Sequence, residues 1–208
     1  MKRRNWVMLD KTIIENVLSL DDTEQGGDNA LDGFEFQVSS AIYLIFNELK
    51  NSNNFILLYE KIEDFIIFTD VINLYQAKST SNSVTPNFLY KKPPSRKKDE
   101  YKLSIIEKMN DNYTFIKDKL PSNTIVNNLI ICENQIFSKK LSKLSNITEL
   151  KEFAFTDLSI DVKKDIINNT KNTNYDWDNI KAIRLIPKSR HEEVTRIHIE
   201  NVITQTIG

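Results

Sequence analysis

The chain has 208 residues, Lys+Arg 28 against Asp+Glu 29, a formal net charge of −1 and 40% hydrophobic residues, which predicts one globular domain with a substantial core. The one cysteine rules out an internal disulfide and a structural zinc site, and the two histidines disfavour Ser-His-Asp hydrolases and imidazole-rich metal centres. The four glycines form no GxGxxG or GxxxxGK[ST] loop, so the remaining chemistry belongs to carboxylates, amides and lysines.

The N-terminal segment has no apolar run typical of a signal peptide, and no stretch approaches the roughly 20 apolar residues of a membrane span. Together with the scarcity of cysteine, this predicts a cytoplasmic protein that does not contact a membrane. Because the net charge is near zero, a nucleic-acid partner would require a local concentration of positive charge.

Hydrophobic periodicity predicts two helices in the first quarter of the chain. Residues 6–20 are expected to form a short amphipathic helix, which an acidic loop at 21–29 follows. A longer helix is expected to begin near Gly33 and to end at 51–54. Its apolar stripe is predicted to consist of Phe34, Val38, Ala41, Ile42, Ile45 and Leu49.

The period then changes to that of strands. Apolar runs at 55–60, 63–69 and 72–78 predict three strands joined as a meander or hairpin. The segment 79–100 contains three prolines and is expected to be a long exposed loop with a basic tip. The residues of this tip are Lys91, Lys92, Arg96, Lys97 and Lys98.

A second amphipathic helix is expected at 101–119 and a buried strand at 125–132. The front of the chain therefore runs helix, strand, strand, strand, helix, strand. Weaker patterns predict the remaining elements: a short segment at 137–144, a strand near 151–155, a helix near 159–169, a strand at 182–187 and a helix at about 190–206.

Three polar residues are expected to meet where two of these strands pair. Gln76 and Lys78 lie two residues apart on one strand, so both leave the same face. If a three-residue loop centred on Asp70 joins this strand to the preceding one, Asp64 lies directly opposite Gln76. A two-residue loop would shift the register by one and turn Asp64 to the other face.

Such a cluster suits metal-assisted hydrolysis of a phosphodiester. Mg²⁺, with Mn²⁺ as an alternative, prefers oxygen ligands and is commonly held by one or two carboxylates together with substrate phosphate. Asp64 and Gln76 would supply oxygens, and Glu60 is a candidate second carboxylate. Lys78 would orient or help to deprotonate the attacking water and offset charge on the phosphate. The competing interpretation is a solvated strand end without function.

These residues resemble the active-site pattern of the PD-(D/E)XK nuclease superfamily in its Gln-x-Lys variant. They are similar, more closely, to the double-stranded-DNA endonuclease domain of CD-NTase-associated (CBASS) effector nucleases of bacterial antiphage defence, to which domains of Lamassu-type systems are related. In that family a GFxFQ helix, an Exx(D/E)D stretch and a QxK strand occur in this order. Here they are residues 33–37, 60–64 and 76–78.

The resemblance implies an α/β (α+β), restriction-endonuclease-like fold with an α-β-β-β-α-β core and a mixed central sheet flanked by helices. It implies a nuclease domain at 25–208 that follows a helical extension at 1–24. The catalytic set would be Asp64, Gln76 and Lys78, with Asp64, Gln76 and Glu60 around the metal. Gln37 would approach the water at the metal or support the site.

The implied function is a metal-dependent endonuclease acting on double-stranded DNA in antiphage defence, with the basic tip at 91–98 gripping phosphates. Since such a nuclease must be kept off, we expect a homo-oligomer or regulatory subunits of a defence complex. No sensor domain for a cyclic oligonucleotide is recognised, so we expect either a longer protein or regulation by separate subunits. The alternative is a catalytically inactive nuclease-like module for DNA docking or complex assembly.

Overall fold

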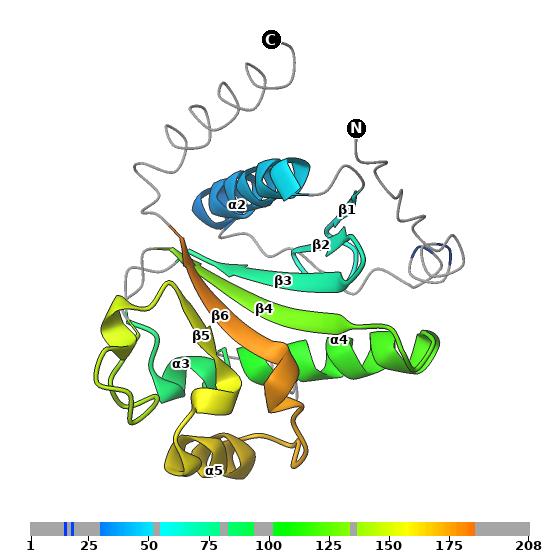
Figure 1. Ribbon diagram of the computed structural model, residues 1–208. Coiled ribbons are helices and arrows are strands. Elements are labelled where there is room, and N and C mark those ends of the chain that lie inside the picture. Colours follow the sequence, from blue (N-terminus) through cyan, green and yellow to red (C-terminus); the bar gives the residue numbers. More distant parts are fainter. Residues whose placement is uncertain are drawn as a thin grey trace.

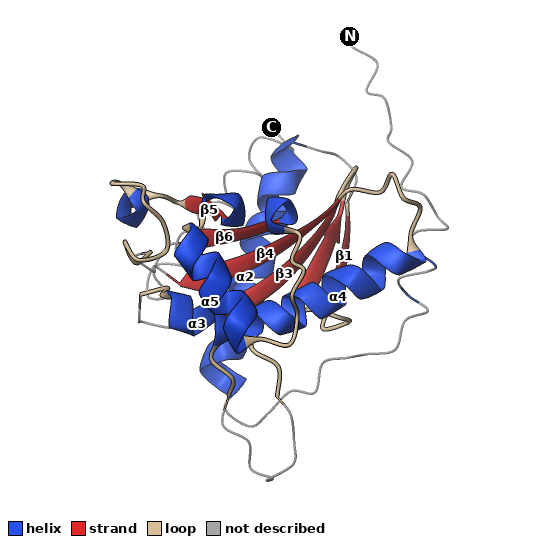
Figure 2. Cartoon of the chain, turned by 90° about the horizontal axis from the view of Figure 1, so that it is seen from below, coloured by secondary structure: helices blue, strands red, loops and turns tan. Residues whose placement is uncertain are grey.

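A central sheet with helices on both faces forms the protein in the computed structural model, which describes residues 15, 18, 30–51, 55–79, 83–93, 102–133 and 137–185 (Figure 1). One long helix covers one face of the sheet, and three helices lie on the other face (Figures 1 and 2). The long helix is α2 (Ala30–Asn51), and the others are α3 (Pro86–Tyr90), α4 (Ile105–Lys119) and α5 (Ile160–Asn169). Apart from the helical Glu15 and Leu18, the helices expected at 6–20 and 190–206 lie outside the described residues.

The sheet has six strands in the order β1-β2-β3-β4-β6-β5. The first three form an antiparallel meander, β3, β4 and β6 run parallel, and β5 returns antiparallel along β6. This mixed topology confirms the expected restriction-endonuclease-like α-β-β-β-α-β core. The strands are β1 (Ile56–Tyr59), β2 (Phe65–Phe68), β3 (Ile72–Lys78), β4 (Val126–Glu133), β5 (Glu152–Ala154) and β6 (Ile180–Leu185).

The β2–β3 hairpin adopts the register that places Asp64 opposite Gln76. Phe65 pairs with Tyr75 and Phe68 with Ile72, which leaves residues 69–71 as a three-residue loop. Within this loop the Thr69 backbone N–H donates to the Val71 carbonyl at 2.9 Å. Of the two loop lengths considered, the structure therefore has the three-residue loop.

Helix α2 buries only part of the predicted stripe. Phe36 and Ala41 are 1% and 2% exposed and pack toward β2 and β3, whereas Phe34 and Leu49 are 47% and 39% exposed. The expectation holds for Ala41 and was wrong for Phe34 and Leu49, because apolar side chains occur on several sides of this helix and periodicity alone does not identify the side that meets the sheet. The helix also begins at Ala30, earlier than expected.

The segment expected to be one long exposed loop contains an ordered, partly buried stretch. Val84 forms a parallel bridge with Phe137, and the five-residue α3 follows directly. The Thr85 side chain caps α3, whose first residue is proline, a residue well suited to the first turn because its fixed φ is helical. Val84 and Leu89 are buried in the core, so the expectation of an exposed loop was wrong here.

Helix α4 begins with a capping box that fixes its N-terminus. The Ser104 side chain accepts from the Glu107 backbone N–H, and the Glu107 carboxylate accepts from the Ser104 backbone N–H at 2.9 Å. Both residues are fully buried, and the Glu107 carboxylate also accepts the Lys171 backbone N–H at 2.8 Å. The first turn of α4 is therefore tied to the chain just beyond α5.

The core that supports β3 generates a stability prediction. Leu74 is fully buried and packs with Ile66 and Ile116 between the sheet and α4. Leu74→Ala should lower the free energy of unfolding by about 2–5 kcal/mol, because it removes buried apolar atoms and leaves a cavity. Urea denaturation followed by circular dichroism measures the change. Ile160→Ala, at a side chain 69% exposed, is the control and should stay within about 0.5 kcal/mol.

Candidate active site

Asp64 and Gln76 are in direct contact at the end of the β2–β3 hairpin. Asp64 precedes the first residue of β2, and its Oδ2 accepts from Gln76 Nε2 at 2.6 Å. The same oxygen accepts the backbone N–H of Ala77 at 2.5 Å. Gln76 is only 2% exposed, so this contact is made largely out of water. The carboxylate is thereby held against the strand that carries the QxK motif.

The polar residues of β3 share the face of the sheet that α4 covers. Leu74 packs in the core on the α4 side, whereas Tyr75 and Ala77 pack on the α2 side. Alternation along the strand places Gln76 and Lys78 on the α4 side with Leu74. The α4-facing side of β3 thus changes from apolar at Leu74 to polar at Gln76 and Lys78, next to Asp64.

The turn before Asp64 is held by hydrogen bonds to one carbonyl group. Glu60 has a φ of 52°, unusual for a residue other than glycine, and its backbone N–H donates to the Asp64 carbonyl at 3.0 Å. Gln37 Nε2 on α2 donates to the same carbonyl at 3.0 Å. This contact of Gln37 favours the supporting role among the two expected for it. Glu60 is exposed, and its described contact with the site is the hydrogen bond of its backbone N–H.

Asn112 and Glu63 are neighbours of the site that the sequence patterns did not single out. Asn112 on α4 donates at 2.9 Å both to the Ile62 carbonyl and to Glu63 Oε1. Glu63 is fully buried beside Asp64 in the sequence. The available signal was that Asn112 lies three residues after Met109 and four before Ile116, on the buried stripe of α4. A polar residue on such a stripe requires a partner.

Tyr59 lies at the end of β1, just before this turn, and forms an edge-to-face contact with Phe34. Burial raises the pKa of the Tyr59 phenol to about 12, and the negative charges of Glu60 and Asp64 contribute to the shift. The phenol is therefore neutral at physiological pH and adds no charge to the site.

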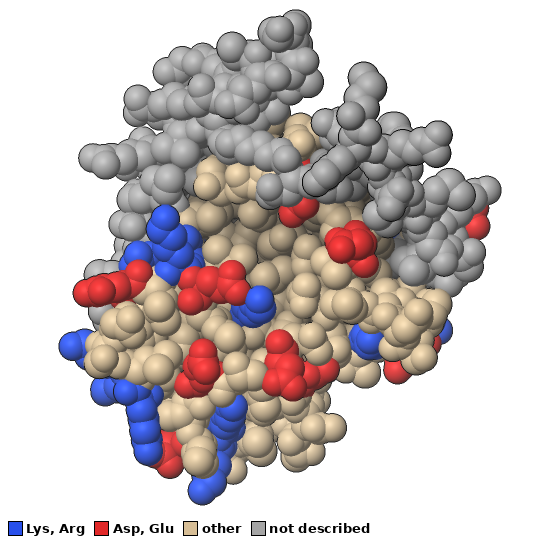
Figure 3. All heavy atoms as spheres, in the orientation of Figure 1, with Lys and Arg blue, Asp and Glu red and all other residues tan. Residues whose placement is uncertain are grey.

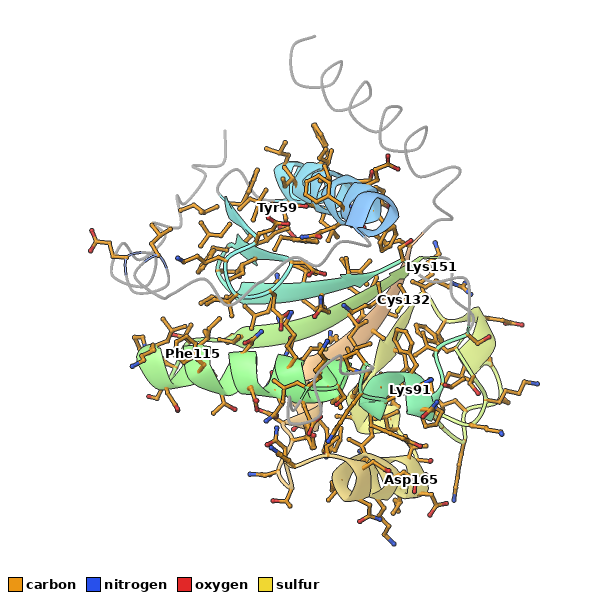
Figure 4. The ribbon with its side chains drawn as sticks, turned by 180° about the vertical axis from the view of Figure 1, so that it is seen from behind. Tyr59, Lys91, Phe115, Cys132, Lys151 and Asp165 are labelled. Atoms are coloured by element: carbon orange, nitrogen blue, oxygen red, sulfur yellow. The ribbon has the colours of Figure 1, made fainter. Side chains whose placement is uncertain are left out.

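A pocket of about 470 Å³ opens beside Gln76 and Lys78. Its other walls come from α3, the residues that follow it, and the first turn of α4, and Figure 4 labels Lys91 on this side of the molecule. On the face seen in Figure 3 acidic and basic side chains are interspersed, whereas the described residues around this pocket include four lysines and no carboxylate. The lining residues are Gln76, Lys78, Phe88, Lys91, Lys92, Pro93, Leu103, Ser104, Ile105 and Lys108.

The structure thus brings most of the predicted site residues together. Asp64 contacts Gln76, and Lys78 lies on the same strand face. Lys91 and Lys92 from the expected basic tip line the pocket that Gln76 and Lys78 share. The other three residues of the tip, Arg96, Lys97 and Lys98, lie outside the described residues.

The donor set fits a hard, oxygen-preferring cation. Over residues 30–51, 55–79, 83–93, 102–133 and 137–185, no group of three or more His, Cys, Asp or Glu side chains could hold a metal. A nitrogen- and sulfur-liganded zinc site is therefore a poor match there. Mg²⁺ is compatible with a single carboxylate because it keeps several waters and shares substrate phosphates. The Asp64 carboxylate and the adjacent Gln76 amide, which carries both a donor and an acceptor, fit this pattern.

A mixed sheet in this order, with a carboxylate before β2 and a Gln-x-Lys motif at the end of β3, defines the restriction-endonuclease-like class of nucleases. Residues 25–208 match the family described as "Cap4, dsDNA endonuclease domain", and the chain belongs to this family. It is accordingly a DNA endonuclease domain of antiphage defence. No curated protein and no solved structure matches the chain.

In the part of the chain that the structure describes, none of the helices combines the length and the apolar character that crossing a membrane requires.

The two contacts of Asn112 generate a prediction about the turn that carries Asp64. Asn112→Ala removes both donated hydrogen bonds and leaves the buried Ile62 carbonyl and Glu63 carboxylate without them. We expect a loss of about 1–3 kcal/mol in the free energy of unfolding, larger if Glu63 is charged. Chemical denaturation at pH 7 measures it.

Asn110→Ala is the matched control, since Asn110 is half-buried on the same helix and has no described hydrogen bond from its side chain. This variant should change the free energy of unfolding by less than about 0.5 kcal/mol. Equal losses in the two variants would contradict a specific role for Asn112.

Proposed function

We propose that this domain is a metal-dependent endonuclease that hydrolyses phosphodiester bonds of double-stranded DNA with Asp64, Gln76 and Lys78 as its catalytic set. The observation that supports this most directly is the contact of the Asp64 carboxylate with Gln76 and Ala77, one residue before Lys78. The three side chains combine a negative charge, an amide and a cation, and two of them, Gln76 and Lys78, line the lysine-rich pocket. Membership of the endonuclease family supports the same assignment.

Asp64 and Gln76 would hold the metal, Mg²⁺ or Mn²⁺, with Glu60 as the candidate for a second carboxylate. A divalent ion bound there would polarise the phosphoryl group and lower the pKa of a water molecule. Binding of the Asp64 carboxylate by the Ala77 N–H keeps this ligand at the end of β3 whether or not the Gln76 amide changes its orientation. Gln37 and Asn112 act as positioning residues, since they contact the turn rather than the space around the carboxylate.

Lys78 supplies a positive charge on the same strand as Gln76. Its side chain is half-buried and lines the same pocket as Gln76. An ammonium group held there would donate hydrogen bonds to the attacking water and to the phosphate oxygens as negative charge develops. Partial exclusion of water increases the effect of this charge.

The proposal also covers how the domain contacts DNA and how its activity is regulated. Lys91 and Lys92 would contact phosphates from the wall that faces Lys78, together with the other residues of the basic tip. A nuclease of this kind requires restraint, so we expect a homo-oligomer or regulatory subunits of a defence complex. Size-exclusion chromatography with light scattering, with and without DNA, tests this part, and a strictly monomeric, constitutively active domain would contradict it.

The catalytic assignment predicts loss of cleavage without loss of fold. Asp64→Asn and Lys78→Ala should each reduce the rate of plasmid nicking or linearisation in Mg²⁺ by at least about 100-fold, because general acid–base and electrostatic groups typically contribute 10²–10⁴-fold. EDTA should stop cleavage by the wild type, and Mn²⁺ should support it. Supercoiled plasmid resolved on agarose gels gives the rates, and circular dichroism melting checks the fold.

Asp70→Asn is the matched control, since Asp70 is an exposed carboxylate in the loop of the same hairpin. It should cut at the wild-type rate. Normal cleavage by both Asp64→Asn and Lys78→Ala would exclude this catalytic set. A wild type that binds DNA but never cuts it, alone or with its partners, would favour the alternative of an inactive docking module.

A further inference from the structure

The pocket beside Gln76 and Lys78 has the size and the lining of a site for one nucleotide, and the catalytic proposal leaves most of it unused. We propose that it binds one nucleotide of the DNA strand that passes the catalytic set, with Lys91, Lys92 and Lys108 around the phosphate. The inference rests on the proposed function, because it assigns the pocket to the same DNA strand. It adds Lys108 and the first turn of α4 to the substrate-binding surface.

The pocket is large enough to hold one nucleotide. Its volume of about 470 Å³ lies within the range of roughly 300–1,000 Å³ that small-molecule sites occupy. Gln76 and Lys78 form one wall, and Ser104, Ile105 and Lys108 form another. A group bound there would therefore touch the catalytic strand and α4 at the same time.

The charge of the pocket favours an anion. Four lysines line it, and none of its described lining residues is a carboxylate; one of the four, Lys92, has its Nζ 3.9 Å from Glu107 Oε1. The Glu107 carboxylate is fully buried and accepts hydrogen bonds from Ser104 and from the Lys171 backbone. The described lining of the pocket is therefore cationic, and a phosphate is a complementary ligand for it.

The rest of the lining favours a nucleotide over a bare phosphate ion. Phe88, Pro93, Leu103 and Ile105 supply apolar surface beside the lysines, and Leu103 is 39% exposed. A sugar or base can pack on such surface while its phosphate meets the ammonium groups. A site for inorganic phosphate alone would not need these four side chains.

The lysines project from anchored backbone, which makes their placement specific. Lys91 ends α3, and its backbone N–H donates to the Asn87 carbonyl at 2.8 Å. Leu89, two residues earlier, is fully buried. Lys108 lies one turn into α4, where its backbone N–H donates to the Ser104 carbonyl at 3.0 Å. A phosphate between them would thus meet charges fixed by two separate helices.

Binding measured without cleavage tests the inference. In the Asp64→Asn background without divalent cations, Lys91→Ala and Lys108→Ala should each weaken binding of a fluorescein-labelled duplex about 3- to 10-fold near 0.1 M salt, as expected for a lost phosphate contact. Each should also reduce the slope of log K against log[salt] by about 1. Fluorescence anisotropy measures both. Lys92 is left intact because its contact with Glu107 links it to the fold.

Lys164→Ala is the matched control, since Lys164 is exposed on α5 and does not line the pocket. It should retain the affinity and the salt slope of the background. Affinities and slopes for Lys91→Ala and Lys108→Ala equal to those of Lys164→Ala would overturn the inference. Undiminished plasmid cleavage by Asp64→Asn would instead overturn the proposed function, and the binding data do not depend on that result.

Competition separates a nucleotide from a phosphate. A deoxynucleoside 5′-monophosphate should displace the duplex from the background protein at lower concentration than inorganic phosphate does. This preference should diminish in Leu103→Ala, which removes part of the apolar lining, whereas Lys108→Ala should weaken competition by both ligands because both carry the phosphate. Equal competition by the two ligands in the background protein would overturn the assignment of a nucleotide site.

Discussion

The register of the β2–β3 hairpin is the constraint on which the whole candidate site depends. All four residues of β2 are buried, and both of its faces are apolar, so a shift by one residue would exchange apolar side chains for apolar side chains. The hydrophobic pattern alone therefore discriminates poorly between registers. The three-residue loop at one end and the hydrogen bonds of Asp64 to Gln76 and Ala77 at the other end do discriminate, since a shifted strand would lose them. The candidate catalytic contact thus also specifies the fold of its own hairpin.

The two helical layers hold the turn before β2 from opposite sides. Gln37 reaches the Asp64 carbonyl from α2, and Asn112 reaches the Ile62 carbonyl and the Glu63 carboxylate from α4. The turn contains a non-glycine residue with positive φ, a conformation that persists only when its surroundings hold it. These contacts supply that restraint, so the position of the Asp64 carboxylate depends on side chains from both faces of the sheet.

Local patterns were sufficient for the order of the front elements, and they narrowed the central contact to a choice between two hairpin registers. The short polar loop around Asp70 left two registers open, and the structure adopts the three-residue loop that brings Asp64 and Gln76 together. The buried stripe of α2 was not accessible in this way, because Phe34 and Phe36 both continue an apolar pattern and only packing on the sheet selects Phe36. The contact of Asn112 with Glu63 joins residues 49 positions apart in the sequence, so it is recognised only in the three-dimensional structure.

The placement of the basic residues after β3 was also not predictable from local sequence patterns. Prolines and lysines in series are typical of exposed loops, yet Pro86 suits the first turn of α3, and the burial of Val84 and Leu89 anchors that helix. Because α3 is anchored, Lys91 at its C-terminal end lines the pocket beside Gln76 and Lys78. A chain with a net charge near zero can therefore present a strongly positive site, because the charge is concentrated by backbone structure rather than by composition.

Helix α4 connects this positive site to the candidate catalytic carboxylate. Its first turns pack Ile106 and Met109 in the core shared with α3 and α5, and Ile116 packs in the core beneath the β2–β3 hairpin. Between these two cores, Lys108 lines the pocket and Asn112 holds the turn before Asp64. Both residues lie on one rigid helix, four positions apart and so on nearly the same side. Displacement of α4 would therefore move Lys108 and the support of Asp64 together, which would couple the proposed DNA contact to the placement of the carboxylate.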